Sequence, residues 1–420
     1  MEYVQNGIIP RICRNGSAIF DEHILGRPLA ATASIAFALM FFVGDLKGNF
    51  QSEWDPSASG IDLTAAVFSL GLVVAAISFF ANDGKICTQI KWIIALFLAI
   101  SCAVTWTVLT PYAVEKITRF FTLSLISATL PAFIFTRPKE VRLFIYSVVG
   151  AGFLISLAGL FQVITGTNVN GRISGISADT VGLGRNAGIA LVGLYAVVSC
   201  GRKKRMWLGV FCLPLLLVLI ASGSRGPAFF ALGIIVLITV FWARYNLRGI
   251  AITIAIFAVA TFVIYQDASV LPKLTLDRFA FIIEHRWDSS AEERVIAGSA
   301  AIEEIGRSPL GLGIGGFGQV YNFGSVTDRV YPHNIVLEIA VEDGWMVGIL
   351  FLFIASIGIL RSYRAAAVEP AFRSFFAIFL FAICNALVSG DMNDNRIVYA
   401  LLCIALMLPQ LMTKSLPADR

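Results

Sequence analysis

Apolar runs long enough to cross a lipid bilayer follow one another along most of this 420-residue chain. A helix needs about 20 apolar residues to cross the hydrocarbon core of a bilayer. Backbone groups find no water there, so a crossing segment must satisfy them internally, as a helix does. Twelve candidate runs are present, at residues 28–44, 63–81, 92–110, 117–136, 143–164, 185–200, 206–222, 227–243, 249–266, 344–360, 371–389 and 397–412. The sequence therefore predicts an all-α polytopic membrane protein with about twelve transmembrane helices.

The composition disfavours a chain of separate soluble domains. Hydrophobic residues make up 57% of the sequence and charged residues 14%, whereas soluble domains carry about 25% charged residues. The mean hydropathy is +0.80. The formal net charge is +5, but in a membrane protein such an excess reflects lysine and arginine in cytoplasmic loops. It therefore gives no indication of nucleic-acid binding.

The charge of the connecting loops alternates along the chain. If the N-terminus lies inside, the cytoplasmic connections are basic: "RPKEVR" (137–142), "GRKKR" (201–205), "RYNLR" (244–248) and "RSYR" (361–364). The opposite connections "DLKGNFQSEWDPSASGID" (45–62) and "GDMNDNR" (390–396) are acidic. Cytoplasmic loops of membrane proteins are enriched in lysine and arginine. We therefore expect both termini in the cytoplasm.

These assignments divide the chain into five parts. The N-terminal segment shows no cleavable signal peptide, so the first apolar run is expected to remain as a span. The parts are a cytoplasmic N-terminal segment (1–27), transmembrane helices 1–9 (28–266), a periplasmic loop domain (267–333), transmembrane helices 10–12 (334–412) and a cytoplasmic tail (413–420).

The large periplasmic loop is itself predicted to be helical. One amphipathic stretch covers 274–287, and a second helix is expected from Ser290 to a stop at Gly306 and Pro309. Val295, Ile302 and Ile305 share one face of that second helix. We therefore expect a small helical cap on the outer face of the membrane.

Several arginines lie in the outer loops, where topology disfavours positive charge. They are Arg172, Arg225, Arg278, Arg286 and Arg294. The planar guanidinium presents a fork of donors that suits phosphate oxygens. Such a group at the membrane surface suits a lipid-linked phosphate or diphosphate. The alternative for each is pairing with a carboxylate or a lipid headgroup.

Arg225 is the most distinctive of these arginines. It lies in the short Gly/Ser turn "ASGSRGP" between two strongly apolar runs, and Pro227 is well placed to open the next helix. Such a turn exposes backbone N–H groups beside the guanidinium. A plain turn needs no arginine, so the sequence favours a functional role.

His333 lies in "YPHN", where a hydrophobic helix is expected to begin. The helix dipole disfavours the imidazolium there, so we predict a neutral ring that could accept a proton from a hydroxyl. Asn334, Glu338 and Glu342 recur every four residues and form one polar stripe. The alternative is an interfacial histidine that only caps the helix. His333 and the arginine-rich loop are predicted to lie on the same side of the membrane, which favours a catalytic role for His333. His285 is the competing histidine on that side.

Two other patterns in the sequence do not predict a binding site. "GLGIGG" (311–316) matches G-x-G-x-x-G, but no strand precedes it, so it predicts a flexible turn and not a dinucleotide site. Three scattered histidines and the lack of cysteines in outer loops leave no ligand cluster for a metal. We therefore predict a metal-independent protein without a cofactor.

Taken together, these motifs resemble those of the O-antigen ligase and polymerase superfamily of bacterial envelope glycosyltransferases. The resemblance rests on "R-x-S-G" (172–175), "SGSRG" (222–226) and the pattern "R…SPLGLGIGGFG…YPHN…LE…EDG" (294–344). The motifs cover roughly the second half of the chain, and the third is the most specific in its order and spacing. The remainder agrees in span number and topology.

The resemblance implies a GT-C-like membrane fold in the inner (cytoplasmic) membrane of a bacterial cell, with a periplasmic active site. The donor would be a glycan on undecaprenyl (polyprenyl) diphosphate, and the acceptor a lipid A–core sugar or a second lipid-linked glycan, with membrane lipids around both. Arg172 and Arg225 would hold the diphosphate and stabilise the leaving group, and His333 would activate or orient the acceptor hydroxyl. Further candidates for substrate binding are Arg278, Arg286, Arg294, Tyr331, Asn334 and Glu338.

Three functions follow from these motifs. A ligase moves a finished glycan onto lipid A–core, and a polymerase joins lipid-linked repeat units. We favour the ligase because the chain has a single developed outer loop. A lipid-linked glycan transporter is the alternative of another class. It is disfavoured because the predicted span interiors are almost free of the ionisable residues that coupled transport requires.

Overall fold

The structure is a computed structural model. It describes residues 28–43, 63–81, 86–167, 173–177, 179–199, 203–243, 250–252, 254–256, 258, 289–321 and 329–413. All regular secondary structure in these ranges is helical, as predicted.

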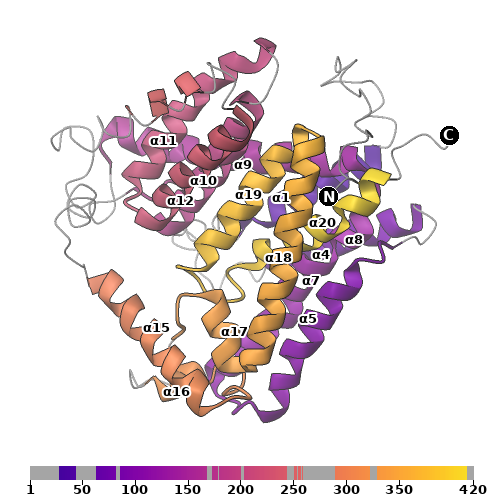
Figure 1. The fold of residues 1–420 in the computed structure, drawn as a ribbon, viewed down its shortest axis with the longest axis vertical. Helices are drawn as coiled ribbons and strands as arrows, with labels where there is room; N and C mark the ends of the chain where they lie inside the picture. The colour runs from indigo at the N-terminus through magenta and orange to yellow at the C-terminus, as the bar shows by residue number, and fades with distance from the viewer. Residues whose placement is uncertain are drawn as a thin grey trace, which may run out of the picture.

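The first half of the described chain is a series of helices (Figure 1). They are α1 (Pro28–Met40), α4 (Leu63–Ala81), α5 (Ile90–Cys102) with η1 (Ala103–Trp106), α6 (Pro111–Arg119) with η2 (Phe120–Ser124), α7 (Leu125–Thr129) and α8 (Pro131–Ile134), α9 (Pro138–Thr165) and α10 (Thr180–Ser199).

The second half adds further membrane helices and a cluster of shorter ones. They are η3 (Lys203–Phe211) with α11 (Cys212–Ala221), α12 (Arg225–Ile238) with η4 (Thr239–Ala243), α15 (Ser289–Arg307), α16 (Phe317–Val320), α17 (Ile335–Asp343), α18 (Trp345–Val368), α19 (Ala371–Ala386) and α20 (Arg396–Thr413).

These helices agree with a polytopic membrane protein. Six are long and apolar enough to cross a bilayer: Pro111–Ile134, Pro138–Thr165, Thr180–Ser199, Arg225–Trp242, Trp345–Val368 and Arg396–Thr413. Shorter apolar helices occupy the other predicted runs, except 249–266, which is described at few positions. The number twelve stays a prediction.

The predicted start of the fourth span at residue 117 is too late. The helical segment begins at Pro111, which occupies the first helical position, and Thr110 caps it by accepting a hydrogen bond from Ala113 N at 3.2 Å. The apolar pattern missed this first part because Glu115 and Lys116 interrupt it. Lys116 therefore lies in a membrane helix and not in a loop.

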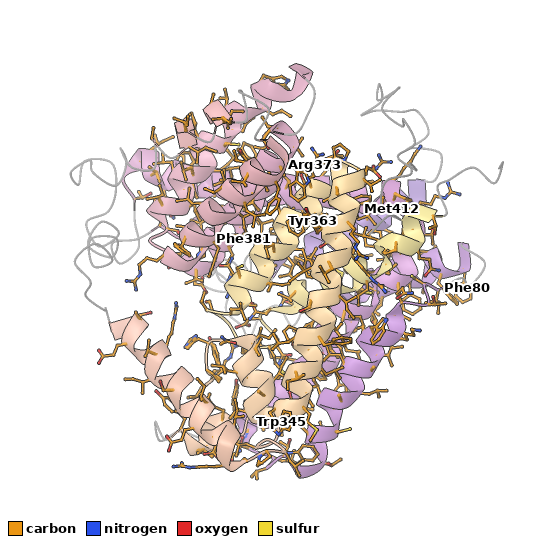
Figure 2. The ribbon with its side chains drawn as sticks, viewed as in Figure 1. Phe80, Trp345, Tyr363, Arg373, Phe381 and Met412 are labelled. Carbon is orange, nitrogen blue, oxygen red and sulfur yellow. The ribbon has the colours of Figure 1, made fainter. Side chains whose placement is uncertain are left out.

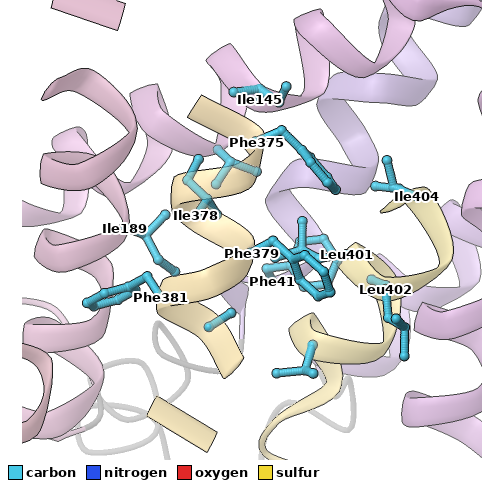
Figure 3. Close-up of a cluster of buried hydrophobic side chains, with 14 of the residues drawn as sticks. Phe41, Ile145, Ile189, Phe375, Ile378, Phe379, Phe381, Leu401, Leu402 and Ile404 are labelled. Carbon is cyan, nitrogen blue, oxygen red and sulfur yellow. The ribbon is translucent and has the colours of Figure 1, made fainter. Parts of the chain in front are cut away.

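α10 is the central helix of the bundle. In the most apolar stretch of α10, 78% of the residues are buried, compared with 33% in that of α18. Glycines allow its neighbours to approach closely, since a Cβ on Gly152 of α9 would lie 2.8 Å from the backbone oxygen of Asn186. On the other side α19 and α20 interdigitate through Phe379, Leu401 and other apolar side chains (Figure 3).

Large apolar side chains also cover the outside of the bundle. Phe80 is 77% exposed and points away from it (Figure 2). Leu154, Phe161 and Phe229 are likewise exposed by 65–74%. Such a surface suits contact with lipid tails and not with water.

The shorter helices α15, α16 and α17 gather at the end of the bundle where Trp345 lies, opposite Arg373 and Met412 (Figures 1 and 2). This arrangement agrees with the predicted helical cap. The buried face of α15 consists of the small residues Ala297 and Ala301, which pack with Phe317 and Val341. Of the predicted apolar face, Ile305 packs here, while Val295 and Ile302 are 51% and 62% exposed.

Substitution of the α9 glycines tests this packing. We expect Gly152→Ala to destabilise the protein by about 1–3 kcal/mol, since the added methyl group overlaps rigid backbone of α10. Gly150→Ala is the matched control, because no atom lies within 4 Å of its added Cβ. Thermal unfolding of the purified proteins in detergent measures both. Equal midpoints for the two variants would contradict this packing.

Candidate functional site

Polar side chains from four separate segments meet at one end of the bundle. The segments are the turn before α12, the start of α10, the α19–α20 loop and residues 329–334. Ser224 Oγ donates a hydrogen bond to Thr180 O at 2.9 Å, and Arg329 pairs with Asp391. We call this the site end, and it is the end that the loop charges predict to face the periplasm.

His333 has an unusual backbone conformation. Its φ is 56°, and within the described residues it is the one non-glycine with a positive φ. The next residue, Asn334, caps α17 by accepting hydrogen bonds from Val336 N and Leu337 N at 2.9 and 3.1 Å. The left-handed conformation is uncommon outside glycine and is concentrated at functional sites. His333 therefore lies just before the helix, held by the cap that follows it.

The imidazole of His333 is neutral at pH 7. Burial, together with the positive charges of Arg294 and Arg185, lowers its pKa to about 4. Its Nδ1 is buried and has no hydrogen-bond partner among the described residues. This direction agrees with the predicted neutral ring, but its causes are burial and two arginines and not the helix dipole. The Tyr331 ring lies 4.5 Å from the imidazole, measured between centroids.

Arg185 was missed by the sequence reasoning. It lies in the second turn of α10 and was counted as the first residue of an apolar span. A Cβ added to Gly390 would lie 2.9 Å from its Nη2, which places the guanidinium against the α19–α20 loop. An arginine inside an otherwise apolar span is itself a signal of function. An arginine within an apolar run could therefore have identified Arg185 as a candidate site residue from the sequence.

Arg225 begins α12 directly after the predicted tight turn. Gly223 has a φ of 66°, and Ser222 Oγ accepts a hydrogen bond from Ser224 N at 3.2 Å. Both serines pack on Gly184 of α10, so a Cβ there would lie 2.8 Å from Ser224 Cβ. The turn therefore holds the start of α12 against Gly184, the residue directly before Arg185. Arg225 and Arg185 belong to adjacent helices at the same end of the bundle.

The "R-x-S-G" motif is described in part. Backbone N–H groups of Ser174 and Gly175 donate to Gln162 Oε1 of α9 at 3.2 and 2.9 Å. Arg172 itself lies outside the described residues, as do Arg278, Arg286 and the predicted helix 274–287. Their roles stay predictions.

An ion network ties the segment before His333 to the bundle. Arg329 Nη2 lies 3.1 Å from Asp394 Oδ2 and also pairs with Asp391. Arg119 of α6 lies 2.8 Å from the other oxygen of Asp394. Burial disfavours the charged form of Asp391, but Arg329 and Arg119 outweigh it and hold the pKa of this carboxyl below its usual value. The sequence predicted the loop 390–396 as an acidic connection. Its aspartates pair with Arg329 and Arg119, so the loop holds the segment before His333 against the bundle.

Lys116 forms a second, fully buried ion cluster. Its Nζ lies 2.6 Å from Glu338 Oε1 and 2.7 Å from Glu342 Oε2, and all three side chains have no exposed surface. The predicted polar stripe of α17 therefore faces α6 inside the protein. Glu338, a predicted substrate ligand, contacts a lysine there and not an open cavity.

The glycine-rich segment 311–316 joins the same cluster. Gly315 N donates to Glu342 Oε2 at 2.9 Å, and Gly313 N donates to Glu342 O at 2.8 Å. Gly311 and Gly313 both have φ of 84°, and a Cβ on Gly311 would lie 2.3 Å from Glu342 O. The segment follows a helix, as predicted. It is a packed contact and not a flexible turn.

The fold and site define a polytopic, all-helical membrane protein with a polar site at one end. Residues 210–352, about a third of the chain, match the sequence model of a family described as O-antigen ligase. No curated protein matches the chain. The family match confirms the predicted resemblance to O-antigen ligases and polymerases. It includes Arg225, Arg294 and His333, whereas Lys116, Arg185 and Asp391 lie outside it.

Removing the buried lysine tests the Lys116 cluster. We expect Lys116→Ala to destabilise the protein by about 3–5 kcal/mol, because it leaves two buried carboxylates without their cation. Arg307→Ala is the control, since its pair with Glu303 is exposed and contributes about 0–1 kcal/mol. Thermal unfolding in detergent measures both variants. A loss no larger for Lys116→Ala than for Arg307→Ala would contradict the buried pairing.

Proposed function

We propose that the protein is a glycosyltransferase of the ligase type, which moves a glycan from a polyprenyl diphosphate onto a lipid A–core sugar at the periplasmic face of the inner membrane. The observation that carries this proposal is the environment of His333. A neutral imidazole with a buried, unpartnered Nδ1 lies in the field of two arginines that come from different elements, α10 and α15. The family match supports the same class of reaction.

Each group has a chemical role in this transfer. The acceptor hydroxyl oxygen bonds to the anomeric carbon of the donor glycan. The bond from that carbon to the diphosphate oxygen breaks, and its electron pair stays on the diphosphate. The hydroxyl proton passes to His333. Arg185, Arg225 and Arg294 stabilise the charge that grows on the leaving diphosphate, and the activated donor makes nucleotides unnecessary.

Donor binding would also raise the basicity of His333. Arg294 and Arg185 lower the pKa of His333 in addition to burial. A diphosphate between them neutralises their charge, so the pKa of His333 rises toward its ordinary value once the donor is bound. The ring then becomes a stronger base when a substrate is present.

The glycan ladder of a deletion strain tests the proposed function. We expect bare lipid A–core in the deletion strain, with long chains accumulating on the polyprenyl carrier, and full repair by the wild-type gene. We expect His333→Ala and His333→Asn to fail because they remove the proton acceptor. Asparagine tolerates the left-handed backbone of residue 333, so this variant separates the imidazole from the fold.

His23→Ala is the matched histidine control and should restore the ladder, because residue 23 precedes the first span on the predicted cytoplasmic side. Core capped by a single repeat unit would identify a polymerase instead of a ligase. An unchanged ladder with altered uptake of lipid-linked glycan would favour a transporter. Full repair by His333→Ala at normal expression would contradict the catalytic role.

The pH dependence of transfer tests the electrostatics of His333. The ring must be neutral to act, and its pKa of about 4 in the free protein keeps it neutral through the whole range above that value. We therefore expect kcat/KM of the wild type to fall only as the pH drops toward about 4. Arg185→Gln removes one cause of the low pKa and should move this acid limb to higher pH. An acid limb near the ordinary histidine value of about 6.5 in the wild type would contradict this account.

A further inference from the structure

A small cavity lies directly beside His333, on the side of α15. Its volume is about 100 Å³, and it lies between α15, the end of α16 and the segment that leads to His333. Its lining consists of Glu293, Ala297, Tyr321, Arg329, Val330, Tyr331 and His333. The family resemblance assigned no role to Glu293, Tyr321 or Arg329.

The lining combines flat aromatic rings with hydrogen-bonding groups. Tyr321 is stacked on Phe317, with 5.1 Å between centroids and 13° between ring planes. The guanidinium of Arg329 lies 6.0 Å from the centroid of Tyr331. Tyrosine hydroxyls, a carboxylate and a guanidinium together offer both donors and acceptors. This set suits a ligand with several hydroxyl groups and an apolar ring face.

The charges of the cavity exclude the diphosphate as its occupant. Glu293 would repel an anion. The positive charge of Arg329 is already balanced by Asp391 and Asp394. The cavity therefore favours an uncharged polar group.

The size of the cavity limits the ligand to a single ring. An apolar cavity of about 150 Å³ holds a benzene molecule, and this cavity is somewhat smaller. Glu293 and Arg329 are exposed at its rim. The edge of one six-membered sugar ring fits, while the remainder of a longer glycan stays outside.

We propose that this cavity is the subsite for the terminal sugar of the acceptor, held by Tyr321, Glu293 and Arg329 so that one hydroxyl reaches His333. The inference rests on the proposed transferase function and deepens it. Donor and acceptor then occupy different sides of His333. The diphosphate lies among Arg185, Arg225 and Arg294, and the acceptor sugar lies against Glu293 and Tyr321.

Steady-state kinetics of the purified full-length protein test this subsite. The donor is a polyprenyl-diphosphate glycan, and the acceptor is either detergent-solubilised lipid A–core or a lipid-linked repeat unit. We expect Glu293→Gln and Tyr321→Phe each to raise KM for the acceptor about tenfold through a lost hydrogen bond to a sugar hydroxyl. KM for the donor and the pH profile should not change. Glu292→Gln, an exposed neighbour outside the lining, is the matched control and should behave as wild type.

The outcomes separate the two proposals. An unchanged acceptor KM in both Glu293→Gln and Tyr321→Phe, with wild-type transfer intact, overturns the subsite alone. An equal rise in the donor KM also overturns it. Lack of transfer by folded wild-type protein with either acceptor overturns the proposed function, and the subsite with it. Size-exclusion profiles that match the wild type show that each variant is folded.

Discussion

The buried pairing of Lys116 with Glu338 and Glu342 determines where the rest of the site lies. A charge removed from water costs several kcal/mol unless a partner is held in good geometry, so α17 cannot slide along α6 without losing these contacts. Asn334 caps the start of α17, and His333 directly precedes that cap. The position of the imidazole is therefore set by an ion pair that belongs to the interior of the protein. The glycine segment 311–316 adds a second contact to the same carboxylate.

Cations at the site end fall into two groups. Lys116, Arg119 and Arg329 are paired with buried or half-buried carboxylates and hold elements together. The charges of Arg185 and Arg294 lower the pKa of His333, in addition to the effect of burial. The first group makes the site rigid. The second group lowers the pKa of His333.

Much of this arrangement could be predicted from sequence, because long apolar runs and the alternation of loop charge are local signals. The start of α17 after His333 and the Gly/Ser turn before Arg225 follow from short-range rules, whereas the neutral state of His333 depends on burial and on distant arginines. Arg185 and Lys116 could not be found in the same way. One was hidden at the edge of an apolar run, and the other was read as part of a loop. Their importance comes from partners more than 140 residues away in sequence, which no periodicity reveals.

The boundary of the family match has a consequence for how the protein is built. Residues 210–352 carry Glu338 and Glu342, but the lysine that neutralises them lies on α6, outside that range. Without the rest of the chain, the matched region would leave Glu338 and Glu342 without their cation, and α17 would lose its contact with α6. The matched segment is thus a unit of sequence and not a unit of folding. Grafting it onto another membrane scaffold would require that scaffold to supply a buried cation at the same depth.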